Sequence, residues 1–175
     1  TETPQGIIAV CEMRSKRLDD FLASGKMLLV LDRVTDPGNI GTMLRTADAA
    51  GVGGLLLLQG CADIYAPKTV RASMGSLFHL PVLSGLSEEL LVQAARKAGY
   101  ELLVTCLDGA DNLYKADLQG RIAFVMGNEA NGVSPALLAA ADKRVFIPMQ
   151  GRAESLNVAM AAGIVMFEAL RQKLK

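Results

Sequence analysis

Six short apolar runs alternate along this sequence with segments of helical pattern, and this alternation constrains the fold more than any other feature. The runs cover residues 6–13, 26–32, 53–60, 100–108, 121–127 and 144–149. Within each run the apolar residues are nearly continuous, which is typical of strands buried on both faces of a parallel sheet. The alternation therefore predicts an α/β fold, with an open parallel sheet and flanking helices.

Three of the intervening segments carry clear helix signals. Residues 39–51 place apolar residues at helical spacing and end at a glycine. Residues 87–99 begin with a capping serine and two glutamates and close with two basic residues, which suits the helix dipole. Residues 135–142 begin with a proline, a residue favoured in the first turn. We expect a helix in each segment.

The last helix is predicted to open at Ser155 as its N-cap, with Asn157 in its first turn. Its apolar positions form two stripes, the first made of Leu156, Met160, Ile164 and Phe167 and the second of Val158, Ala162, Val165 and Ala169. A helix that is apolar nearly all round is buried. A partner subunit is the simplest cover, and we expect Ala159, Ala162 and Gly163 to allow its close approach.

Composition limits the class of protein. With 175 residues, 51% of them hydrophobic and 21% charged, the chain suits one globular domain. No apolar run is long enough for a membrane span, and the first residues do not resemble a signal peptide. Three well-separated cysteines suggest buried free thiols in a reducing compartment, hence a cytoplasmic location. The single histidine and the absence of a CxxC pattern argue against a metal site.

Three glycine-containing loops follow strands, at residues 32–47, 124–134 and 148–157. In open α/β sheets, ligands bind beyond the carboxyl ends of the strands. We expect Arg45, about one turn into its helix, to reach back over the first loop, and Glu129 to offer an acid in the second. Each loop could instead be a plain turn or helix cap. Neither a GxGxxG nor a GxxxxGK[ST] motif is present, so a Rossmann site and a P-loop are unsupported.

The three loops also carry a family resemblance. The stretches DPGNIGTMLRTADAAGV, FVMGNEANGVS and IPMQGRAESLNVAMAAGIVMFEALRQ resemble, in order, the three signature motifs of the SpoU (TrmH-like) branch of the SPOUT superfamily. The stretch VRASMGSLFHLPV is similar to an intermediate segment of that branch. These enzymes are S-adenosylmethionine-dependent RNA ribose 2′-O-methyltransferases. The resemblance implies a deep C-terminal trefoil knot that forms the cofactor site, and a homodimer joined through the knot region and the last helix.

The resemblance also assigns roles to residues. The catalytic set would be Asn39, Arg45, Glu129, Ser155 and Asn157. Contacts to S-adenosylmethionine would come from Thr105, Leu107, Met126, Gly127, Asn128, Ile147, Pro148, Met149, Ser155 and Leu156. RNA would be bound by Arg45, Lys68, Arg71 and Ser73, and no metal would be needed. Because arginine is not normally deprotonated, we expect Arg45 to position and polarise the ribose hydroxyl.

Residues 1–6 are predicted to be the remnant of a linker and residues 7–175 the catalytic domain, with an N-terminal RNA-recognition domain absent from this chain. The formal net charge of zero fits that division, since bulk charge gives no attraction to RNA. The substrate would be ribosomal or transfer RNA. A non-catalytic RNA-binding module of the same fold is the alternative, although it need not keep Arg45, Glu129 and Asn157 together. A flavodoxin-like nucleotide enzyme is a further alternative, although it would place its phosphate loop after the first strand and would need no third motif.

Overall fold

The computed structural model describes residues 6, 9–13 and 16–174. The helices are α1 (Leu18–Ala23), α2 (Pro37–Ala49), α3 (Pro67–Ala72), α4 (Glu88–Lys97), α5 (Pro135–Ala140) and α6 (Val158–Lys173). The strands are β1 (Leu28–Leu31), β2 (Gly54–Leu58), β3 (Val82–Leu86), β4 (Glu101–Thr105), β5 (Asp111–Asn112), β6 (Ile122–Met126) and β7 (Lys143–Phe146). Two short 3₁₀ helices, η1 (Ser76–Phe78) and η2 (Leu113–Lys115), follow α3 and β5.

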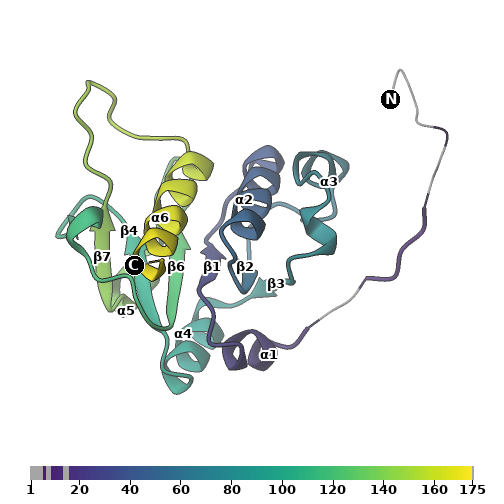
Figure 1. Ribbon diagram of the computed structural model, residues 1–175, viewed down its shortest axis with the longest axis horizontal. Coiled ribbons are helices and arrows are strands. Elements are labelled where there is room, and N and C mark those ends of the chain that lie inside the picture. Colours follow the sequence, from purple (N-terminus) through teal and green to yellow (C-terminus); the bar gives the residue numbers. More distant parts are fainter. Residues whose placement is uncertain (1–5, 7–8, 14–15, 175) are drawn as a thin grey trace.

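The strands form one seven-stranded sheet in the order β3-β2-β1-β6-β4-β7-β5. Every neighbouring pair is parallel, which confirms the predicted fold class. In Figure 1, α2 and α6 lie side by side over one face of this sheet. Side chains of α1, α4 and α5 join a separate core cluster, which places these helices on the other face.

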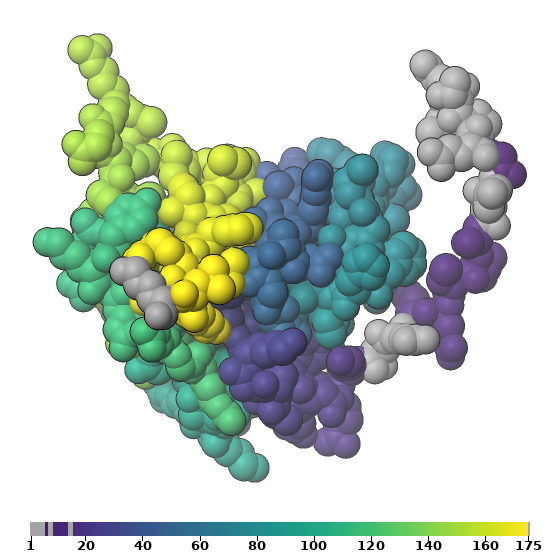
Figure 2. Space-filling model, in the orientation of Figure 1, coloured from purple at the N-terminus to yellow at the C-terminus, as the bar shows by residue number. Residues whose placement is uncertain are grey.

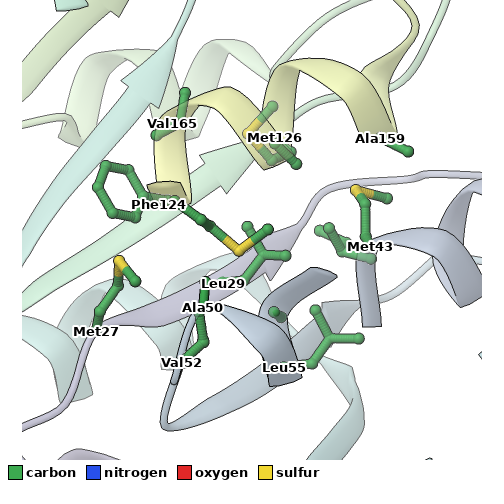
Figure 3. Packing of buried hydrophobic residues seen from close by; sticks show 14 of the residues in the cluster. Met27, Leu29, Met43, Ala50, Val52, Leu55, Phe124, Met126, Ala159 and Val165 are labelled. Atoms are coloured by element: carbon green, nitrogen blue, oxygen red, sulfur yellow. The ribbon is translucent and has the colours of Figure 1, made fainter. Parts of the chain in front are cut away.

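The core has two layers because the central strands are buried on both faces. Along β1, Leu29 and Leu31 belong to the cluster shared with α2 and α6, whereas Leu28 and Val30 belong to the opposite cluster. All four side chains are 0% exposed. Figure 3 shows the first cluster, with Leu29 and Phe124 from the strands packed among side chains of α2 and α6. The continuous apolar runs thus identified these strands correctly.

One predicted strand is not found, and two observed strands, β3 and β5, were not predicted. The apolar run at residues 6–13 forms no strand in its described part, residues 6 and 9–13, and Val10 there is 99% exposed. A strand needs a partner to pair with, so β-propensity alone does not make one. The missed β3 lies at the sheet edge, half-exposed, and is interrupted by Gly85 at a φ of 79° with a register shift in its pairing. The two-residue β5 is polar and too short to show a pattern.

The helix signals in the middle of the chain were reliable. In α4, the Ser87 hydroxyl accepts a hydrogen bond from the Leu90 amide at 3.2 Å, as a capping serine should. In α5, Ser134 caps and Pro135 occupies the first turn. The shorter α1 and α3, with six residues each, lack the length for a periodic pattern.

The last helix differs from its prediction at its start. Helix α6 begins at Val158 with Asn157 as its N-cap, so Ser155 lies outside it and is not the cap. Ala159 and Ala162 are buried in this chain's own core, and are therefore not available for the close approach of a partner. Met160 and Phe167 are 61% and 47% exposed, so only the first predicted stripe leaves large apolar side chains uncovered.

The cysteine prediction was only partly correct. Cys11 is exposed, and Cys61 and Cys106 are half-buried, with all three thiols free.

No helix in the described part of the chain combines the length and the apolar character needed to cross a bilayer.

Candidate functional site

A cavity of about 370 Å³ opens at the carboxyl edge of the sheet, beyond β4 and β6. Its volume falls within the range of roughly 300–1,000 Å³ that is usual for small-molecule sites. Its walls are Thr105, Met126, Gly127, Asn128, Glu129, Gly132, Ser155, Leu156, Asn157, Val158 and Ala161. These residues mix apolar side chains with amide, hydroxyl and carboxylate groups, so the cavity suits a ligand that is partly apolar and partly polar.

Three polar side chains from distant parts of the sequence meet at this cavity. The Asn39 amide nitrogen donates to the Glu129 carboxylate at 2.9 Å. The Asn157 amide nitrogen in turn donates to the Asn39 side-chain oxygen, also at 2.9 Å. One residue comes from each of the three loops expected to carry chemistry. The structure therefore brings together three of the five predicted catalytic residues, and a fourth, Ser155, lines the same cavity.

Asn39 is held in place by the start of α2. The Asp36 carboxylate caps this helix by accepting hydrogen bonds from the backbone N–H groups of Gly38 and Asn39. Those hydrogen bonds, from Asn39 first, lower the pKa of Asp36, and Lys68 at 3.4 Å also contributes. The side chain of Asn39 therefore projects from a capped first turn.

Asn157 has two functions at once. Its side-chain oxygen accepts hydrogen bonds from the backbone N–H groups of Ala159 at 2.9 Å and Met160 at 3.3 Å, which caps α6. Its side-chain nitrogen holds Asn39. The amide group must therefore have one fixed orientation, because only that orientation satisfies both sets of partners.

The loop between β6 and α5 is tightly folded. A Cβ on Gly127 would lie 2.3 Å from the backbone of Gly132 and Val133, so only glycine fits there. Asn128 and Gly132 exchange two backbone hydrogen bonds, at 3.0 and 2.9 Å. This compact turn presents Glu129 at its tip, exposed to solvent.

Arg45 lies further from the first loop than expected. It is the ninth residue of α2, about 12 Å along the helix axis from Pro37, and not one turn from its start. Its side chain is exposed, and it makes no hydrogen bond or ion pair with any residue that the structure describes. Arg45 is therefore free to contact a ligand or a partner, although it does not join the Asn39 group.

The other predicted residues divide into two groups. Eight of the predicted catalytic and cofactor residues line the cavity, namely Thr105, Met126, Gly127, Asn128, Glu129, Ser155, Leu156 and Asn157. Leu107 is 70% exposed and does not line it, nor do Ile147, Pro148 and Met149, which are partly buried. Figure 2 shows the segment between β7 and α6, in lime green, standing out from the body; residues 150–157 are all exposed.

The residues predicted to bind RNA differ in exposure. Lys68 and Arg71 are exposed on α3. Ser73 is 1% exposed, and its hydroxyl donates to the Val70 carbonyl at 2.8 Å. The structure thus gives Ser73 a partner in the backbone of its own helix, and its role in RNA binding stays a prediction.

Three cavity residues were not predicted: Gly132, Val158 and Ala161. Gly132 lies within the second glycine loop, so its place in that loop was a usable signal. Val158 and Ala161 follow Asn157 by one and four residues, which is the spacing that places side chains on one side of a helix start. No group of three or more His, Cys, Asp or Glu side chains among the described residues could hold a metal ion.

The chain matches known proteins over most of its length. The model of the SpoU rRNA Methylase family matches residues 26–167. The chain is 41% identical to the 23S rRNA (guanosine(2553)-2′-O)-methyltransferase RlmP of Bacillus subtilis (strain 168) over 167 residues, covering 95% of this chain and 65% of the relative. It is also 41% identical to the 23S rRNA (uridine(2479)-2′-O)-methyltransferase of Streptomyces viridochromogenes over 179 residues, covering 99% and 62%.

A solved structure shares the fold as well. The AdoMet-bound rRNA methyltransferase from Sinorhizobium meliloti superposes with a TM-score of 0.88 at 39% identity, over 94% of this chain and 63% of that one. The chain thus spans less than two thirds of the length of these three relatives. Because the family model matches most of the sequence and the relatives are this similar, the chain belongs to the SpoU rRNA methylase family.

Proposed function

We propose that this chain transfers a methyl group from S-adenosylmethionine to a ribose 2′-hydroxyl of ribosomal or transfer RNA. The observation that carries the proposal is the hydrogen-bonded group of Asn39, Glu129 and Asn157 beside the cavity. A module that only bound RNA would have no need for three polar side chains, drawn from three loops, at the mouth of a cavity of about 370 Å³. The two relatives from Bacillus subtilis and Streptomyces viridochromogenes are 2′-O-methyltransferases, which supports the same chemistry.

The cavity suits S-adenosylmethionine, in which a polar amino-acid part and a nucleoside part are joined by short alkyl groups at a positively charged methyl sulfonium. Met126, Leu156 and Ala161 offer apolar contacts, and Ser155 offers a hydroxyl for hydrogen bonding. Thr105 at the end of β4 would flank the adenine, and Leu107, Ile147, Pro148 and Met149 would complete the site from the neighbouring loops. Solved relatives from Sinorhizobium meliloti and Streptomyces viridochromogenes carry AdoMet.

When bound, the cofactor would supply a methyl group on a positively charged sulfonium, which is already activated for transfer to an oxygen. The task left to the protein is to orient the hydroxyl and stabilise charge. Arg45, with its free guanidinium, would polarise the 2′-oxygen and pair with the adjoining phosphate. Asn39, Glu129, Ser155 and Asn157 would hold the ribose and keep the reacting groups aligned.

The substrate would be held by local charge, because the chain has no net charge to attract a polyanion. Lys68 and Arg71 are exposed on α3, which packs against α2, the helix that carries Arg45. A path for the RNA backbone along α2 and α3 would bring phosphates to all three cations. An enzyme that modifies these nucleic acids would work in the cytoplasm.

The family also implies a deep trefoil knot in the C-terminal part and a homodimer, and we extend both to this chain. The segment between β7 and α6 would take part in the knot. The exposed side chains of Met160 and Phe167 on α6 would then be covered by the second subunit. Such a dimer would bury the apolar stripe that this chain alone leaves open.

Incubation with tritium-labelled S-adenosylmethionine and total RNA tests the proposed activity. We expect label in 2′-O-methyl nucleosides after complete digestion of the RNA. Binding of the cofactor without transfer to any RNA, including RNA from a strain that lacks the gene, would favour a non-catalytic RNA-binding module. Failure of the purified chain to bind the cofactor at all would contradict the proposal.

A further inference from the structure

Asp32 and Arg33 form an ion pair at the carboxyl end of β1, directly behind the loop that presents Glu129. Asp32 is 0% exposed, and Arg33 donates to both of its carboxylate oxygens, from Nε at 2.8 Å and from Nη2 at 3.0 Å. Arg33 has a φ of 52°, a left-handed conformation that disfavours residues with a Cβ. An arginine stands where glycine would fit the backbone better, which indicates that its side chain is needed.

Each residue of the pair also holds one end of the loop. The second carboxylate oxygen of Asp32 accepts a hydrogen bond from the Ser134 backbone N–H at 2.7 Å. The backbone carbonyl of Arg33 accepts one from the Asn128 side-chain nitrogen at 2.8 Å. The Asn128 side-chain oxygen then accepts from the backbone N–H groups of Ala130 and Asn131, both at 3.0 Å. Two consecutive residues thus fix both ends of residues 128–134.

The loop held in this way contains much of the site. Gly127, Asn128, Glu129 and Gly132 all line the cavity. Glu129 lies between the two anchor points and accepts the hydrogen bond from Asn39. A shift of this loop would therefore change the cavity wall and the position of the Asn39 group together.

We infer that Asp32 and Arg33 are positioning residues that set the conformation of residues 127–134, and through it the shape of the cofactor cavity and the place of Glu129. The inference rests on the proposed function, since S-adenosylmethionine is the ligand it names. Neither residue lines the cavity, so both act through the loop.

The chemistry of the pair explains why these two residue types are needed. A fully buried carboxylate is stable only when its oxygens are paired. Arginine supplies two parallel donors in a fixed plane, whereas lysine supplies charge from a single flexible nitrogen. Without the guanidinium, the buried Asp32 carboxylate would lose two charge-assisted hydrogen bonds, and its hold on the Ser134 amide would loosen.

Arg33→Ala tests the inference through two measurements on the whole chain. Calorimetric titration with S-adenosylmethionine should show affinity weakened about tenfold, since small misplacements of a site are costly. Hydrogen–deuterium exchange should become faster at residues 128–134 and stay unchanged in the strands. Arg33→Lys, which keeps the charge, should restore part of the affinity.

Lys143→Ala is the matched control. Lys143 forms an ion pair of 2.7 Å with Glu101, and both residues lie at the amino ends of their strands, the edge opposite the cavity. This variant should lose an ion pair without any change in cofactor affinity or loop exchange. Equal weakening of cofactor binding in both variants would show that only general stability had changed, and would overturn the inference.

Wild-type cofactor affinity and wild-type exchange at residues 128–134 in Arg33→Ala would also overturn it. If Arg33→Ala does not fold, Asp32→Asn carries the same test, because it keeps an acceptor for the Ser134 amide but removes the charge. If the unaltered protein binds no S-adenosylmethionine, the proposed function fails, and the exchange measurement alone decides whether the pair fixes the loop.

Discussion

Asn39 lies at the centre of the site because its side-chain amide can donate and accept at the same time. It donates to Glu129, which as a carboxylate can only accept, and it accepts from Asn157. The direction of every hydrogen bond in the group is therefore set by Glu129. An aspartate in place of Asn39 would face Glu129 with a second negative charge and would break the group.

Two replacements of Asn157 should separate its role as the N-cap of α6 from its role as the hydrogen-bond donor to Asn39. Asp caps helices as well as Asn does, so Asn157→Asp should keep α6 stable but lose the donor to Asn39. Asn157→Ala should lose both, with a cost of about 1 kcal/mol in the free energy of unfolding. Thermal unfolding and methyl transfer should be measured on both variants. Equal activity of Asn157→Asp and the wild type would show that the contact to Asn39 is dispensable.

Arg45→Ala should abolish methyl transfer while leaving S-adenosylmethionine binding near its wild-type value. Arg45 does not line the cavity and makes no hydrogen bond or ion pair with a described residue, and its proposed function begins only when a ribose is present. Loss of one such stabilising group typically lowers the rate about 100-fold or more. Single-turnover kinetics and calorimetry measure the two quantities. Collapse of cofactor binding together with activity would show that Arg45 supports the cofactor site.

Among the helices, α2 and α3 cross unusually closely, at Gly41. A Cβ at this position would lie 2.5 Å from the Ala72 Cβ and 2.7 Å from the Thr69 carbonyl oxygen. Gly41→Ala should therefore destabilise the protein by about 1–3 kcal/mol, since neither helix backbone can yield easily. Gly163→Ala is the control, because its Cβ would meet only the Thr46 methyl at 3.4 Å.

We expect Gly163→Ala to raise the stability by up to about 1 kcal/mol, through the higher helix propensity of alanine in α6. Urea denaturation of both variants compares the two glycines directly. A Gly41→Ala protein as stable as the wild type would mean that α3 can move away from α2 without cost.

The N-cap residue of α2, Asp36, should make the stability of the protein depend on pH. Hydrogen bonds from the Asn39 and Gly38 amides lower the pKa of Asp36 in the folded state. The ionised carboxylate therefore contributes stability above its unfolded pKa of about 3.9, and this contribution is lost as the pH falls through the lower folded pKa. Melting temperatures from about pH 6 to about pH 2 should fall less steeply in Asp36→Asn than in the wild type. Parallel pH profiles would show that the cap does not depend on charge.

At the level of elements, the sequence predicted what local pattern controls and missed what tertiary context controls. The central strands were found because burial on both faces demands unbroken apolar runs, as in β1 and β6. The run at residues 6–13 has the same pattern, but its described part pairs with no strand. The N-cap of α6 was misplaced by two residues, since both Ser155 and Asn157 are good capping residues and only the fold selects between them.

For the molecule as a whole, the proposed dimer gives a direct prediction. The double variant Met160→Glu with Phe167→Glu places charge on the exposed stripe of α6 and should convert a dimer to a monomer. Light scattering at micromolar concentration measures the mass. Leu90→Glu is the control, because Leu90 is 50% exposed on α4, over the other face of the sheet. A wild-type protein that is a strict monomer would rule out the dimer.

Much of the site could be predicted because its residues lie in three recognisable glycine loops. That the loops converge follows from the parallel sheet, in which all strands end at one edge. The contacts themselves could not be predicted: residues 39, 129 and 157 are brought together by the insertion of β6 between β1 and β4. The contacts of Asp32 and Arg33 could not be predicted either, because in the sequence these two residues are only polar positions at the end of an apolar run.

The double use of the Asn157 amide has a consequence for how the protein is made. Synthesis proceeds from the N-terminal toward the C-terminal end, so the β1 and β6 regions leave the ribosome before residue 157 does. Until α6 has formed on its cap, Asn39 lacks its second partner and the cavity lacks Val158 and Ala161 from its wall. We therefore expect a chain truncated before α6 to lack both the completed Asn39 group and part of the cavity wall.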